Sequence, residues 1–147
     1  MSFNYHINRI VASAFSTYGL ITRNCKSFNI DVLLSLYFSL VRTKLEYCSI
    51  IWSPIYNIHK NAVDKVQKRF LKLLCFKCDG VYPQRGCNYL GLLQRFDLLS
   101  LEKRREQASI IFLYKILNGT IYCPQLLSEI NILVPILATR QTDSLSL

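Results

Sequence analysis

Apolar residues recur at steps of three and four along the first part of this chain, and this spacing constrains the fold more than any other feature. Between Asn4 and Asn24 the recurring positions are Ile7, Ile10, Val11, Ala14, Tyr18 and Ile21. A repeat of about 3.6 residues places such side chains on one face of a helix. The segment therefore predicts an amphipathic helix whose apolar stripe packs against further elements.

The same spacing predicts further helices, separated by residues that end or begin helices. They are expected over Asp31–Ile51, Asn57–Cys75, Asp97–Asn118 and, as a short last helix, Pro124–Ile130, with one helical turn over Tyr89–Leu93. The predicted breaks are Ser53-Pro54, Asp79-Gly80 and Asn118-Gly119. Proline cannot continue a helix, and glycine takes the left-handed conformation just past a helix end. Ser27 or Asn29 is expected to cap the second helix through its side chain.

The predicted fold class is all-α, because no segment alternates apolar and polar residues between hairpin turns. A chain of 147 residues is long enough to bury one core. We therefore expect a single bundle of four to five helices over residues 3–130, followed by a loose, flexible tail over residues 131–147.

Positive charge is the second constraint, since 18 lysines and arginines face nine acidic residues and give a net charge of +9. Such an excess favours an anionic partner, nucleic acid above all. Lys65, Lys68, Arg69 and Lys72 fall on one face of the third predicted helix and are the candidate nucleic-acid-binding residues. The alternative is an ordinary solvated helix face.

A membrane partner is not expected. The most apolar stretch, Val32–Trp52, is interrupted by Arg42, Lys44 and Glu46, whereas a spanning helix needs about 20 nearly uncharged residues. The N-terminal residues lack the basic-then-apolar pattern of a secretory signal, which predicts an intracellular location, cytoplasmic or nuclear. No small-molecule substrate is predicted.

The six cysteines are expected to be thiols, because thiols stay reduced inside the cell. Cys75 and Cys78 have the spacing of metal ligands, and Cys87 with His59 or Cys123 would complete a zinc site. The second closely spaced pair of a typical zinc site is missing. We therefore predict no metal and no cofactor and keep zinc as the alternative.

Two other groups of residues have competing interpretations. Tyr47 and Trp52 are expected to pack in the core, with base stacking as the alternative. Arg104 and Arg105 are expected to pair with acids, Glu46 or Asp64 among them, rather than to bind a ligand.

Six motifs follow one another in an order that matches a known family. They are His6-Ile7 with Ile10 and Ala14, then LYFSLVRTKLEYC over 36–48, Trp52-Ser53-Pro54, VQKRFL over 66–71, SLEKRR over 100–105 and LYKILNG over 113–119. Together they resemble the C-terminal region of jockey-type non-LTR retrotransposon reverse transcriptases. The likeness runs from Phe3 to about Thr142.

The resemblance implies a helical thumb or connection region, the part that follows the catalytic palm. The family holds its metal ions with a palm aspartate and a Tyr-x-Asp-Asp hairpin, and neither can be matched among the nine acidic residues, no two of which are adjacent. It thus implies a truncated remnant with no catalytic residues or polymerase activity of its own, which binds RNA or an RNA/DNA duplex. The alternatives are an inert or partner-dependent fragment exposing the surface that docks on the missing palm and fingers, and a piece of a longer active reverse transcriptase.

Overall fold

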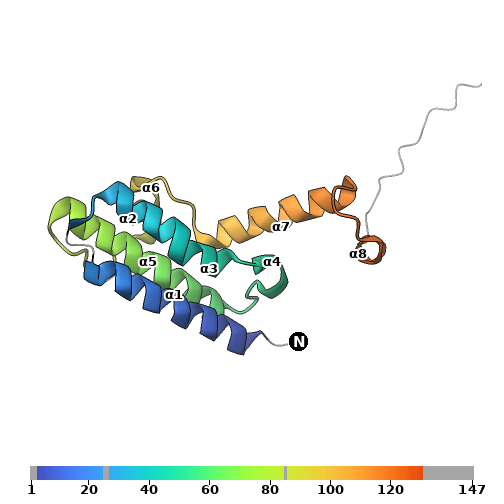
Figure 1. Cartoon of the computed structure of the whole chain (residues 1–147), viewed down its shortest axis with the longest axis horizontal. Helices are drawn as coiled ribbons and strands as arrows, with labels where there is room; N and C mark the ends of the chain where they lie inside the picture. Colours follow the sequence, from blue (N-terminus) through green and yellow to red (C-terminus); the bar gives the residue numbers. More distant parts are fainter. Residues whose placement is uncertain (1–2, 25–26, 85, 131–147) are drawn as a thin grey trace, which may run out of the picture. The chain divides into compact units, whose positions relative to one another are not determined.

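The computed structural model of the chain describes residues 3–24, 27–84 and 86–130. These residues form helices and turns and contain no strand, which confirms the predicted all-α fold class (Figure 1). The chain divides into two compact units, residues 1–112 and 113–147. The single domain over residues 3–130 stays a prediction, and the tail over residues 131–147 lies outside the described residues. None of the described helices combines the length and the apolar character needed to cross a membrane.

The helices of the first unit follow one another closely along the chain. They are α1 (Asn4–Asn24), α2 (Ile30–Leu36), the π-helical turn η2 (Tyr37–Arg42), α3 (Thr43–Glu46), α4 (Ser49–Trp52), α5 (Asn57–Asp79), α6 (Tyr89–Arg95) and most of α7 (Leu101–Leu117). Because α2, η2 and α3 adjoin without a gap, they make one continuous helix over residues 30–46. The second unit holds the end of α7 and α8 (Pro124–Glu129).

Several helix limits agree with the sequence pattern, and the others differ for local reasons. The first predicted helix matches α1 from end to end. Helix α5 continues past Cys75 to Asp79, and Gly80 then takes the left-handed conformation with φ 69°. Helix α7 begins at Leu101 rather than Asp97, because Asp97 itself is left-handed with φ 51°.

The second predicted helix is broken near its end. Cys48 adopts φ 50° and ψ 27°, so the helix stops after Glu46 and resumes as the short α4, which ends before Ser53-Pro54 as predicted. At the start, Asn29 occupies the cap position but its side chain makes no capping hydrogen bond. The cap prediction is therefore wrong for Asn29, whose backbone carbonyl accepts from the Leu33 amide at 3.1 Å.

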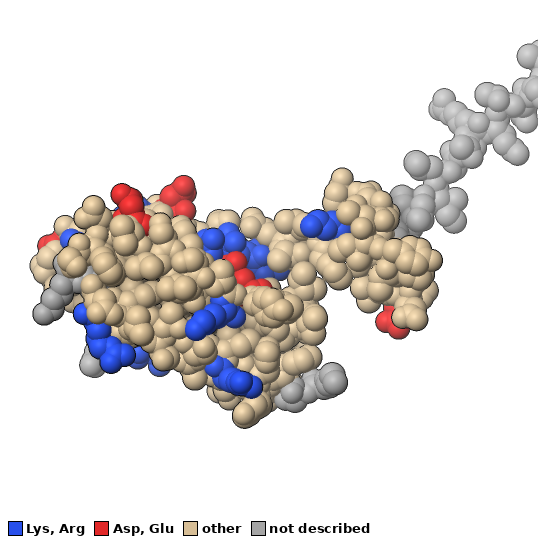
Figure 2. Space-filling view, in the orientation of Figure 1, with Lys and Arg blue, Asp and Glu red and all other residues tan. Residues whose placement is uncertain are grey.

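Helices α1 and α5 lie side by side and run in the same direction, while the helix over residues 30–46 runs opposite to both (Figure 1). The Arg69 backbone carbonyl accepts from Tyr18 Oη at 3.2 Å, which joins α5 to α1. Lys44 Nζ donates to Thr17 Oγ1 at 2.7 Å, which joins α3 to α1. On the face drawn in Figure 2, Lys and Arg side chains lie in separate groups, including groups over α1 and beside α3.

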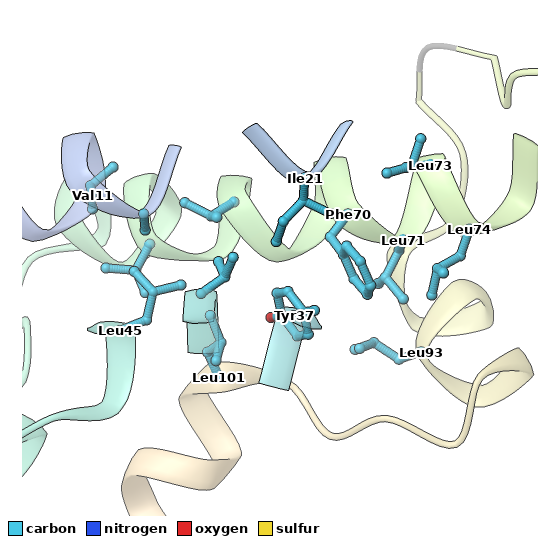
Figure 3. Close-up of a cluster of buried hydrophobic side chains, with 14 of the residues drawn as sticks. Val11, Ile21, Tyr37, Leu45, Phe70, Leu71, Leu73, Leu74, Leu93 and Leu101 are labelled. Carbon is cyan, nitrogen blue, oxygen red and sulfur yellow. The ribbon is translucent and has the colours of Figure 1, made fainter. Parts of the chain in front are cut away.

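The core of the first unit is centred on stacked aromatic rings. The rings of Tyr37 and Phe70 lie 4.1 Å apart between centroids at an interplanar angle of 8°, and both side chains are fully buried (Figure 3). Around them lie the buried side chains of Leu33, Val41, Leu45, Val63, Val66, Leu71, Leu74, Leu93 and Leu101, contributed by α2 through α7. This packing fixes the position of α5, which carries the predicted basic residues.

The Tyr37 hydroxyl gives a test of this core. Its oxygen is buried without a hydrogen-bond partner among the described residues, and burial raises its pKa above the ordinary value. We expect Tyr37→Phe to raise the free energy of unfolding by about 1 kcal/mol, because it removes an unsatisfied buried group and keeps the ring. Chemical denaturation measures this difference.

The matched control is Tyr89→Phe. Tyr89 Oη donates to Gln67 Oε1 at 2.6 Å, so losing this hydroxyl should lower the free energy of unfolding by about 1 kcal/mol. A Tyr37→Phe protein less stable than the parent would contradict the assignment of an unsatisfied hydroxyl.

Candidate nucleic-acid interface

The four predicted basic residues converge on one hollow of the surface. Lys65, Lys68, Arg69 and Lys72 follow at helical steps along α5 and together line a hollow of about 720 Å³. Lys65 and Arg69 are exposed, while Lys68 and Lys72 are half-buried. The buried stripe of α5, Val63, Val66, Phe70, Leu71 and Leu74, packs into the core. The four basic residues therefore lie outside the buried stripe, as their spacing predicts, and their binding of nucleic acid stays a prediction.

The remaining walls of this hollow come from the segment after α5 and from α6. Tyr82, Gly86 and Cys87 line it from the connecting loop, and Tyr89 and Leu92 line it from α6. We call the whole arrangement the basic hollow. Its second wall could not be read from the sequence period, because it depends on how the loop folds back over α5.

Aromatic rings hold three of these four cations. Lys68 Nζ lies 4.7 Å from the centroid of the Tyr89 ring, and Arg69 Cζ lies 4.8 Å from that of Phe15. Lys72 Nζ lies 5.9 Å from the centroid of Tyr82 and donates to the Gln84 backbone carbonyl at 3.4 Å. The negative face of a ring attracts a cation without cancelling its charge. The three groups are thus positioned while staying fully charged.

Within the described ranges, no carboxylate oxygen lies within 4.0 Å of the four cationic groups. Other basic residues are paired instead: Lys60 with Glu102 at 2.9 Å, and Arg95 with Asp79 at 2.6 Å. Asp64 also lies on α5, and the charge of Lys68 influences its pKa. Burial raises the pKa of Asp64, and the charges of Arg105 and Lys68 oppose that rise. Among the described residues, the lining of the basic hollow thus contains four basic side chains and no acidic one.

Gln67 holds the α6 wall in place. Its side chain is 1% exposed, and its Oε1 accepts from Tyr89 Oη at 2.6 Å and from the Leu101 amide at 3.2 Å. Its Nε2 donates to the Leu99 backbone carbonyl at 3.0 Å. The apolar spacing of α5 does not predict this role, although a lone amide among the inward positions of a helix is the signal that points to it.

The expected pairing of the two adjacent arginines is confirmed for one of them. Arg104 Nε donates to Glu46 Oε1, and its Nη2 donates to Glu46 Oε2 at 3.1 Å. Arg105 is 4% exposed, and its Nη1 and Nη2 have no hydrogen-bond partner among the described residues. Burial lowers the pKa of Arg105, and the nearby Asp64 charge opposes this most strongly. Arg105 and Asp64 therefore attract each other, although no direct ion pair joins them within the described residues.

The predictions for the two aromatic residues have opposite outcomes. Trp52 is 2% exposed and packs in the core as predicted. The packing prediction is wrong for Tyr47, which is 77% exposed. The physical reason is helical spacing, since Tyr47 follows Leu40 and Lys44 at steps of four and three and both of these residues are exposed. The buried stripe of this helix is Leu33, Tyr37, Val41 and Leu45.

The cysteines considered as zinc ligands occupy different environments. Cys75 is buried, Cys78 is exposed, and Cys87 is half-buried in the wall of the basic hollow. Burial raises the pKa of the Cys75 thiol, which disfavours the thiolate that a metal requires. Across the described part of the chain, no three His, Cys, Asp or Glu side chains are grouped so as to hold a metal ion.

Comparisons with models of protein families, with curated proteins and with solved structures give no match to this chain. The resemblance to jockey-type reverse transcriptases rests on the sequence motifs.

The role of Gln67 gives a test of how the interface is built. We expect Gln67→Leu to lower the free energy of unfolding by about 2 to 3 kcal/mol, because the Leu101 amide and the Leu99 carbonyl lose a buried partner. Gln107→Leu, an exposed glutamine on α7, is the matched control and should change stability by less than about 0.5 kcal/mol. Urea denaturation of both variants checks this, and equal midpoints would count against the role of Gln67.

Proposed function

We propose that the first unit is a helical module that binds the phosphate backbone of RNA or of an RNA/DNA duplex through Lys65, Lys68, Arg69 and Lys72. The observation that carries the proposal is the convergence of these four cations on one hollow, with no carboxylate partner in the described part of the chain. A cation that is already paired with a carboxylate attracts a phosphate only weakly. A cation that contacts only an aromatic ring keeps its charge and can still bind a phosphate.

The dimensions of the cationic row suit a nucleic-acid backbone. Lys65 and Lys72 are seven residues apart, which corresponds to about 10 Å along a helix. Over that distance a duplex presents about six phosphate charges. Duplexes that contain RNA are recognised mainly by shape and by backbone contacts, so a fixed row of cations suffices without groups that read bases.

In its origin, we infer, the chain corresponds to the region that follows the palm in jockey-type reverse transcriptases. The support is the ordered set of motifs. VQKRFL contains Lys68 and Arg69, which line the basic hollow, and SLEKRR contains Leu101, whose amide donates to Gln67. Nucleotide joining requires two metal ions held by clustered carboxylates, and we assign no catalytic residue to this chain. Polymerase chemistry would belong to a palm, either in a longer polypeptide or in a partner.

The salt dependence of binding tests this function. We expect the parent chain to bind an RNA/DNA duplex with an affinity that falls steeply as salt rises, because phosphate contacts release counterions. Replacing Lys65, Lys68, Arg69 and Lys72 by glutamine should lower the slope of log affinity against log salt by up to about four. Fluorescence anisotropy across a salt series measures both quantities.

The control variant replaces four basic residues outside the basic hollow, Arg23, Lys77, Lys103 and Lys115, by glutamine. It loses the same number of positive charges, so it separates a local interface from general attraction by a basic protein. If the quadruple glutamine variant of the basic hollow binds as tightly as the parent chain, the site assignment is refuted. If both variants lose the same affinity, the attraction is non-specific.

A second candidate function is docking on a protein partner, and the second unit carries the observation that favours it. Among described residues 113–130 only Ile116 is buried, while Tyr114, Leu117 and Tyr122 are 65%, 47% and 89% exposed. Exposed apolar surface of this kind commonly marks an interaction site. This is the property expected of a partner-dependent fragment.

Light scattering after size-exclusion chromatography tests the docking function. The docking function predicts concentration-dependent association of the isolated chain, relieved by Tyr114→Lys with Leu117→Lys. The pair Asn118→Lys with Thr120→Lys adds the same charge at exposed polar positions and should leave association unchanged. A monodisperse monomer at all concentrations would argue against this second function.

A further inference from the structure

A second basic hollow lies between α1 and α3, apart from the four cations on α5. It has a volume of about 460 Å³, and its lining includes His6, Arg9 and Ser13 from α1 with Lys44 from α3 and the ring of Tyr47. None of its lining residues is acidic. We call this arrangement the tyrosine hollow.

The Tyr47 ring is exposed, yet its backbone is tightly held. The Tyr47 amide donates to the Thr43 carbonyl at 2.9 Å, and the Tyr47 carbonyl accepts from Trp52 Nε1 at 2.7 Å. Trp52 is itself buried and meets the His6 ring edge-on, with centroids 5.9 Å apart. A large aromatic ring therefore stands at the surface on a backbone anchored to the core.

The residue that follows Tyr47 is strained. Cys48 has a side chain and a φ of 50°, a left-handed conformation that favours glycine. Such strain persists only where the surrounding structure enforces it, and it concentrates at functional sites. Here it ends the helix over residues 30–46 directly after the turn that carries Tyr47.

The cations of the tyrosine hollow are positioned by neutral groups. Lys44 Nζ donates to Thr17 Oγ1 at 2.7 Å and to Ser13 Oγ at 3.3 Å, and neither hydroxyl cancels its charge. Arg9 is exposed and makes no ion pair with any described residue. Two charged groups thus flank an exposed ring with no acid among them.

We propose that the tyrosine hollow binds a single-stranded segment of nucleic acid, with one base stacked on Tyr47 and its flanking phosphates on Arg9 and Lys44. An exposed ring beside unpaired cations is the combination that binds single strands with little sequence preference. The bases of a duplex are already stacked on one another, so the ring selects an unpaired strand. A hollow of this volume also lies within the usual range for a bound small group.

This site is independent of the proposed duplex interface. On α1, His6, Arg9 and Ser13 lie on one side of the buried stripe, whereas Phe15 and Tyr18, which contact Arg69, lie on the other side. Each hollow can therefore be disabled without altering the residues of the other.

The test uses a fluorescent oligothymidylate, and the same oligomer with one 5-iodouracil for photo-crosslinking. We expect Tyr47→Ala to weaken binding of the single strand about fivefold or more, because a base loses its stacking partner. Tyr47→Phe keeps the ring and should bind as the parent does. Tyr5→Ala removes an exposed ring on α1 that does not line the tyrosine hollow, and this variant should also bind as the parent does. Crosslinks are expected on Tyr47.

Three outcomes would overturn the assignment. Unchanged affinity of Tyr47→Ala, in a protein with the parent's thermal midpoint, would remove the stacking role. Crosslinks on Tyr82 or Tyr89, with affinity lost only when the four α5 cations are neutralised, would assign the single strand to the basic hollow. Equal competition by poly-glutamate at matched charge would assign the tyrosine hollow to acidic protein segments.

Discussion

The side-chain amide of Gln67 joins three elements that the chain connects only through loops. Its oxygen accepts from Tyr89 on α6 and from the first amide of α7, and its nitrogen donates to the carbonyl of Leu99. A buried amide is stable only when its donors and acceptor form hydrogen bonds. Tyr89, Leu99 and Leu101 must therefore lie where they can make these three bonds. That arrangement places the Tyr89 ring beneath Lys68 and so builds one wall of the basic hollow.

The basic residues of the chain fall into two electrostatic groups. Lys60, Arg95 and Arg104 are neutralised by carboxylates and serve to join elements. Lys68, Arg69, Lys72 and Lys44 are instead held by rings, hydroxyls or a backbone carbonyl, which orient a charge without cancelling it. The division explains why a net charge alone does not locate a binding surface, and why the two hollows stand out from the rest of the positive surface.

Helical periodicity was enough to predict the all-α fold, the limits of α1 and the shared face of the four basic residues on α5, because each depends on spacing within one helix. Features that depend on contacts between distant segments were not predictable in this way. The left-handed Cys48 interrupts a pattern that predicts a continuous helix. The roles of Tyr82 and Tyr89 depend on a loop that returns to α5, and that of Gln67 depends on partners up to 34 residues away.

The central claim is that unpaired cations of α5 form the surface that contacts a phosphate backbone. Titration of the isotopically labelled chain with an RNA/DNA duplex, followed by nuclear magnetic resonance of the backbone amides and lysine ammonium groups, tests it residue by residue. We expect the largest shifts between Lys65 and Lys72 and in the facing loop and α6, while the signal of the ion-paired Lys60 stays unchanged. Shifts that spread evenly over all lysines, or that leave α5 unaffected, would contradict it.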